Sequence, residues 1–146
     1  MRDVPACGLK PCFQGFSEAG HRVGLVYASA VPVQAYLNRG NREQRGFQEE
    51  VSRLLITAQY FGALQLAAAR APGRVKVFLL PLGAGIFNNS LASIAHAVSD
   101  AVEWAAEALP AGVGIQDRLD IRVLMYEKNP EEAVEMTRLL SSWGKL

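Results

Sequence analysis

Hydrophobic and polar positions follow two patterns that alternate along this chain. β-branched and apolar residues dominate three short runs, residues 22–33, 75–82 and 119–126, which is typical of strands. Between and after these runs, apolar residues recur at spacings of three and four over residues 47–70, 90–109 and from Pro130 onward, which predicts helices. The predicted order from Arg22 is therefore β-α-β-α-β-α.

The three predicted helices have recognisable apolar faces and ends. The first carries one apolar stripe and is stopped by Pro72 and Gly73; its stripe is Phe47, Val51, Leu54, Leu55, Ala58, Gly62 and Leu66. Asn89 or Ser90 can cap the second helix, whose predicted buried face is Leu91, Ile94, Ala95, Val98, Val102, Ala105 and Leu109. Asn129 and Pro130 suit the start of the third helix, which is expected to bury Ala133, Met136, Leu140 and Trp143.

Strands that alternate with long helices imply an α/β fold, with a mostly parallel sheet and helices packed on its faces. Right-handed crossovers would place the C-terminal ends of all three strands at one edge, where ligands of open α/β sheets bind. That edge would gather residues 27–32, 83–89 and 126–129. Residues 1–21 lack periodicity and are expected to form an irregular lead-in to a single domain over residues 22–146.

A glycine-containing turn, Gly83 to Asn89, joins the second predicted strand to the second helix. A helix start after such a turn offers unpaired N–H groups to a phosphate, and glycines let the ligand approach the backbone. No Gly-Lys-Ser/Thr follows, which excludes a P-loop, and Asn88 stands at the third glycine position of a dinucleotide fingerprint. A phosphate cradle and a simple tight turn both remain open from these residues alone.

Composition narrows the class of protein. The chain has 146 residues, half of them hydrophobic and 20% charged, and a net charge of +1 gives no broad attraction to nucleic acid or to an anionic membrane. No apolar run approaches the roughly 20 residues that span a bilayer, and the N-terminus lacks a signal-peptide core, so a cytoplasmic location is expected. Cys7 and Cys12, with His21 and His96, do not complete a zinc set, so no metal or cofactor is expected.

The segment from Leu79 to Asn89 resembles the second phosphate loop of macro domains, the ADP-ribose-binding modules. In that family a strand with a proline near its end is followed by Gly-x-Gly-aliphatic-aromatic and a helix. Residues 22–32, 59–67 and 119–142 are also similar to the corresponding elements of the family. The resemblance implies a three-layer α/β/α sandwich that binds ADP-ribose, an ADP-ribosylated protein or a related nucleotide diphosphate.

The resemblance also implies roles for particular positions. The loop backbone would wrap the diphosphate and the distal ribose, Tyr126 would stack on adenine, and Asn129 would reach a ribose hydroxyl. The alternatives are a rim aromatic for Tyr126 and a helix cap for Asn129. The implied ligand-binding residues are Gly83, Ala84, Gly85, Ile86, Phe87, Asn88, Tyr126 and Asn129.

The chain departs from the macro-domain pattern in its first half. It has no Asn-Ala-Ala-Asn with a following glycine run, and Ser90 stands where the family usually has proline. We therefore expect the C-terminal portion of a macro domain or a divergent member, with a partner chain or a missing N-terminal segment completing the sheet. No residue stands out as a catalytic base, so the sequence favours ligand binding. An ADP-ribosyl hydrolase, and a degenerate domain with a structural or protein-interaction role, are the alternatives.

Overall fold

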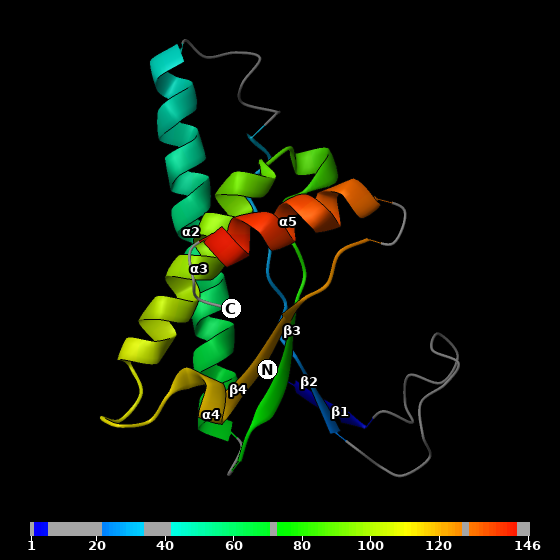
Figure 1. Ribbon diagram of the computed structural model, residues 1–146. Coiled ribbons are helices and arrows are strands. Elements are labelled where there is room, and N and C mark those ends of the chain that lie inside the picture. Colours follow the sequence, from blue (N-terminus) through cyan, green and yellow to red (C-terminus); the bar gives the residue numbers. More distant parts are fainter. Residues whose placement is uncertain (1, 6–21, 34–41, 71–72, 127–128, 143–146) are drawn as a thin grey trace.

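The computed structural model describes residues 2–5, 22–33, 42–70, 73–126 and 129–142 of the chain (Figure 1). Their fold is mixed α/β. Cys7, Cys12 and Trp143 lie outside the described residues. The elements in chain order are β1 (Arg2–Pro5), β2 (Arg22–Leu25), α2 (Arg42–Arg70), β3 (Val75–Leu79), the 3₁₀ helix η2 (Gly85–Phe87), α3 (Leu91–Glu107), α4 (Ile115–Arg118), β4 (Leu119–Val123) and α5 (Pro130–Ser142).

The described strands form two separate pairs. β3 and β4 pair in parallel from Val75 opposite Leu119 to Leu79 opposite Val123. β2 instead pairs antiparallel with β1, which lies within the segment for which the sequence indicated no regular structure. The prediction of one mostly parallel sheet containing all three strands is therefore wrong for the described residues. β2 ends at Leu25, and residues 26–33 continue without strand pairing.

The β3–β4 pair buries one face and exposes the other. Its inner residues pack against the hydrophobic core and are Val75, Val77, Leu79, Leu119, Ile121 and Val123. Phe78 and Leu80, which point the opposite way, are 55% and 63% exposed. The described helices thus cover one face of this pair, whereas a three-layer sandwich would cover both.

α3 is the central helix of the fold. It packs against both α2 and α5, and Figure 1 shows α3 crossing α2 obliquely. This position explains why α3 is buried over most of its circumference. The predicted inner positions Ile94, Ala95, Val98, Val102 and Ala105 are confirmed as buried, as are Met136 and Leu140 of α5.

α2 packs through the face opposite to its most regular apolar pattern. Its buried positions are Ser52, Ile56, Thr57, Tyr60, Leu64 and Ala68. An apolar stripe ordinarily faces the core, yet the predicted stripe of Phe47, Val51, Leu54, Leu55, Ala58, Gly62 and Leu66 points mainly outward: Phe47 is 70% exposed, and only Val51 and Gly62 are half-buried. The buried face was harder to recognise because it includes the polar residues Ser52, Thr57 and Tyr60. We call the outward set the α2 stripe.

The connection between α3 and β4 contains a short helix that the sequence did not predict. α4 spans Ile115–Arg118 within a segment expected to be a loop. No helix in the described part of the chain has the length and apolarity needed to cross a bilayer.

The orientation of α2 can be tested by truncating one buried leucine. Leu64→Ala is expected to lower the free energy of unfolding by about 2–5 kcal/mol, because Leu64 is fully buried and its removal leaves a cavity. Urea titration followed by circular dichroism measures the change. Val134→Ala on α5 is the control, since Val134 is 70% exposed and its truncation should cost no more than about 0.5 kcal/mol. Equal losses for the two variants would contradict this orientation.

Candidate functional site

The loop after β3 begins with a tight turn that requires glycine. The Ala84 N–H donates to the Pro81 carbonyl over 3.3 Å, and Gly83 at the third position has φ +80°. This is the geometry of a type II turn, in which the third residue is normally glycine. A Cβ on Gly83 would lie 2.6 Å from the Ala30 Cβ, so the neighbouring backbone segment also excludes a side chain here.

The second half of the loop exposes backbone to solvent. Gly85 has φ +72°, and a Cβ built on it would meet no atom within 4 Å. Among the described residues, no acceptor receives the N–H groups of Gly85 and Ile86, which begin η2. Asn88 ends η2 in the left-handed region at φ +56°, with its N–H donating to the Gly85 carbonyl over 2.9 Å. The loop therefore presents an open bend with two adjacent donors.

Asn89 ties this loop to two other segments. Its side chain is buried: Nδ2 donates to the Val31 carbonyl over 3.1 Å and to the Gly83 carbonyl over 3.2 Å. Its Oδ1 accepts from the Ser52 hydroxyl of α2 over 2.6 Å. The Asn89 N–H donates to the Gly83 carbonyl as well, over 3.0 Å. One amide side chain thus fixes the loop against α2 and against the segment after β2.

Tyr60 of α2 forms a second attachment to the chain after β3. Its hydroxyl donates to the Leu80 carbonyl over 2.7 Å and accepts from the Leu82 N–H over 2.9 Å. Burial raises the pKa of Tyr60 from 10.0 to about 12, and the bond from Leu82 opposes this only in part. The phenol therefore stays neutral and can make both bonds.

Gln59 of α2 holds the segment after β2 in a similar way. Its Oε1 accepts from the Ser29 N–H over 2.7 Å, and its Nε2 donates to the Ser29 carbonyl over 2.5 Å. A side-chain amide therefore makes the two bonds that a neighbouring strand would otherwise supply. This contact explains how residues 26–33 can lie beside the glycine loop without forming the predicted strand.

The predicted ligand-binding residues gather at one edge of the parallel pair. The Leu124 N–H donates to the Leu79 carbonyl over 2.8 Å, so the segments after β3 and β4 leave the sheet together. Tyr126 is 67% exposed at that edge and Ile86 is 86% exposed on the loop, whereas Phe87 is half-buried and packs against the core.

The two helices that follow these strands begin with different contacts. The Asn129 carbonyl accepts from the Ala133 N–H over 3.3 Å at the start of α5. Ser90 caps α3, with its side chain accepting from the Ser93 N–H over 3.1 Å. Asn89, the other residue that could have capped α3, is instead used in the buried contacts described above.

Three residues of α2 that hold the loop or the segment after β2 were not recognised from the sequence. Ser52 lies two turns before the adjacent Gln59 and Tyr60. α2 carries other polar and charged residues, such as Glu49, Glu50 and Arg53, so these three positions gave no distinctive signal. Their partners are backbone groups 20 or more residues away or a second polar side chain, and such pairings cannot be derived from local spacing.

Acidic residues in the described part do not converge on the glycine loop as a catalytic pair. Asp100 of α3 accepts from Arg53 of α2 over 2.5 Å, and the same guanidinium reaches Glu50 over 2.8 Å. This arrangement is an interhelical ion pair. No group of three or more His, Cys, Asp and Glu side chains able to hold a metal is present among the described residues.

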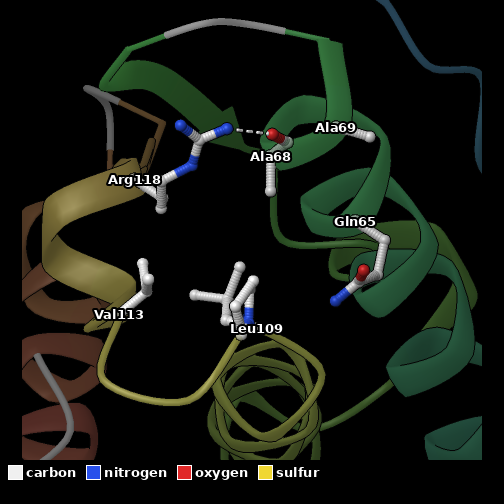
Figure 2. A pocket seen from close by; sticks show the side chains of 7 residues that line it. Gln65, Ala68, Ala69, Leu109, Val113 and Arg118 are labelled. Carbon is white, nitrogen blue, oxygen red and sulfur yellow. Dashed lines mark hydrogen bonds between the residues drawn. The ribbon is translucent and has the colours of Figure 1, made fainter.

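A pocket of about 370 Å³ lies at the other end of β4, before its first residue (Figure 2). Its walls are mostly apolar, and the Arg118 guanidinium at its rim donates to the Ala68 carbonyl over 2.6 Å. Because that carbonyl belongs to the last turn of α2, Arg118 satisfies one of the free carbonyl groups at the C-terminal end of the helix. The lining residues are Gln65, Ala68, Ala69, Leu109, Pro110, Val113 and Arg118. None of them was predicted to bind ligand.

Comparison of the chain with protein-family models, with curated proteins and with solved structures finds no match. Inferences about its function therefore rest on its own residues and their geometry.

Because the loop is attached through Asn89, we expect substitutions of the two adjacent asparagines, Asn88 and Asn89, to have very different effects on the free energy of unfolding. Asn89→Ala should lower the free energy of unfolding by about 2–4 kcal/mol, because buried groups of Val31 and Ser52 lose their partner. Asn88→Gly should change it by no more than about 0.5 kcal/mol, since glycine accepts the left-handed conformation. Urea unfolding of both variants measures the difference. A tolerated Asn89→Ala would show that the buried amide does not hold the loop.

The buried phenol predicts an alkaline transition. Because the pKa of Tyr60 is higher in the folded than in the unfolded chain, its contribution to stability is complete below pH 10 and is lost as the pH rises through about 12. The expected loss is about 2–3 kcal/mol. Tyrosinate absorbance should show one of the four tyrosines titrating near pH 12. Tyr60→Phe should abolish this late component; its persistence in that variant would assign it to another tyrosine.

Proposed function

We propose that the loop Gly83–Asn88 binds the diphosphate of ADP-ribose or of a related nucleotide diphosphate, in a macro-domain-like three-layer fold. The observation that carries the proposal is the open bend at Gly85. Its φ is positive, no atom stands within 4 Å of its missing Cβ, and the adjacent N–H groups of Gly85 and Ile86 have no acceptor in the described part of the chain. Backbone donors on a glycine bend are a common anion-binding device.

The attachments of the loop support the proposal because a preorganised site loses less entropy on binding. The side chains of Asn89 and Tyr60 fix the chain on both sides of Gly83 through buried or half-buried hydrogen bonds. The loop therefore keeps its donors in place without a ligand. A bend that served only to reverse the chain would not need two attachments from a neighbouring helix.

The surroundings of the loop suit a nucleotide. α3 begins at Leu91, directly after the loop, and the positive end of its dipole favours an anion there. Tyr126 is exposed at the same edge of the parallel pair and offers an aromatic face to a base. The exposed outer face of β3 and β4 leaves room for the second helical layer of a three-layer arrangement.

The proposal predicts that Gly85→Glu abolishes binding of ADP-ribose in a calorimetric titration. The added carboxylate would occupy the open space at the bend and repel the diphosphate. Gly112→Glu is a matched control, because Gly112 also has a positive φ, +84°, and open space around it, but lies in the connection between α3 and α4. Both variants should suffer similar backbone strain, of about 1–2 kcal/mol.

Three results would contradict this assignment. The unmodified chain could give no heat and no thermal shift with millimolar ADP-ribose, Gly85→Glu could bind normally, or Gly112→Glu could lose binding to the same degree. Circular dichroism of each variant would confirm that the comparison is made between folded proteins.

A further inference from the structure

The α2 stripe, already defined by its seven residues, is an apolar helix face on which five members are exposed, while Val51 and Gly62 are half-buried. Phe47 is 70% exposed, Leu54 and Leu55 are each 46% exposed, and Leu66 is 41% exposed. The opposite face of the same helix is buried in the core. Contiguous apolar patches on a protein surface mark interaction sites.

The middle of the α2 stripe, from Leu54 to Leu66, is free of charge. Positions three and four apart on this face are apolar or small there, with Gln65 as the polar member, whereas Gln48 and the exposed Glu50 lie beside Phe47 at the N-terminal end of the stripe. Arg53 faces α3, where it pairs with Asp100, and it also pairs with Glu50 over 2.8 Å. A charged partner would find no complementary group between Leu54 and Leu66, whereas the same segment of a second copy meets no like-charge repulsion there.

Four residues in the middle of the α2 stripe have a symmetric pattern of sizes. Ala58 and Gly62 lie one turn apart in the middle, and a Cβ on Gly62 would meet no atom within 4 Å. Larger side chains flank them, Leu54 on one side and Leu66 on the other. In an antiparallel pair centred between residues 58 and 62, Ala58 faces Gly62 of the other copy, and Leu54 faces Leu66. Small residues at the crossing allow two helices to approach closely.

The available area meets the requirement of a specific dimer. Half the surface of a helix about 10 Å across and about 35 Å long, the length from Phe47 to Ala69, is on the order of 500 Å². Two copies would then bury about 1,000 Å², the lower bound of a specific interface. Trp104 of α3, 41% exposed and stacked edge-on against Phe61 of α2, lies beside the stripe and can add to it.

We propose that this chain forms a homodimer in which α2 packs antiparallel against α2 of a second copy through the α2 stripe. The occupant is a second copy because the middle of the stripe is uncharged, its residue sizes at positions 54, 58, 62 and 66 are symmetric about the midpoint of Ala58 and Gly62, and its area is large enough when doubled. The glycine loop lies on another part of the molecule, so dimer formation does not depend on the proposed nucleotide site.

Sedimentation velocity over a wide concentration range tests the association. The unmodified chain is expected to reach twice the monomer mass. Ala58→Glu is expected to give a monomer, because two carboxylates would meet at the crossing, and the variant should keep its fold since Ala58 is exposed in the monomer. Val134→Glu, an equally drastic change at an exposed apolar residue of α5, should stay dimeric.

Cysteine cross-linking tests the antiparallel arrangement in a chain with Cys7→Ser and Cys12→Ser. Leu54→Cys and Leu66→Cys chains should cross-link when mixed, and neither should cross-link with itself. Self-cross-linking of Leu54→Cys would overturn the antiparallel pairing. A monomer at every concentration would overturn the proposal. A dimer that Ala58→Glu leaves intact would also overturn it, because another surface, such as the outer face of β3 and β4, would then form the dimer.

Discussion

The buried amide of Asn89 is the interaction on which the arrangement of the site depends. It joins three parts of the chain that are distant in sequence: α2 through Ser52, the segment after β2 through the Val31 carbonyl, and the turn through the Gly83 carbonyl. A buried amide that lacked any of these partners would be costly. Because the Asn89 amide keeps all three partners, it fixes the position of the glycine turn and also the position of α2 relative to that turn.

The close packing around Gly83 follows from the same constraint. The turn approaches the segment after β2 so closely that a Cβ on Gly83 would overlap both Ala30 and the Asn89 side chain. Gly85, two residues later, has the opposite environment, since nothing fills the space beside it. One glycine thus allows the loop to pack against the protein, and the other leaves its backbone open to a ligand. The proposed binding of a diphosphate rests on that division of roles.

Local patterns predicted most elements but not their pairing. The strands at residues 75–82 and 119–126 and all three long helices were predicted, because periodicity and capping residues such as Ser90 are local signals. The partner of β2 was not, since pairing between strands is decided by distant residues. The inward face of α2 was also mispredicted, because hydroxyl groups on Ser52 and Tyr60 make that face look polar until their buried partners are known. The glycine loop was found from the sequence; the side chains that hold it were not.

Nuclear magnetic resonance titration with ADP-ribose tests the proposed site most directly, because each backbone N–H reports separately. We predict the largest shifts at the N–H groups of Gly85 and Ile86, with smaller shifts at Tyr126. The N–H groups beside the pocket at Arg118 should stay unchanged. An absence of shifts at saturating ligand, or shifts confined to residues around Arg118 and Val113, would contradict the assignment of the glycine loop as a diphosphate site.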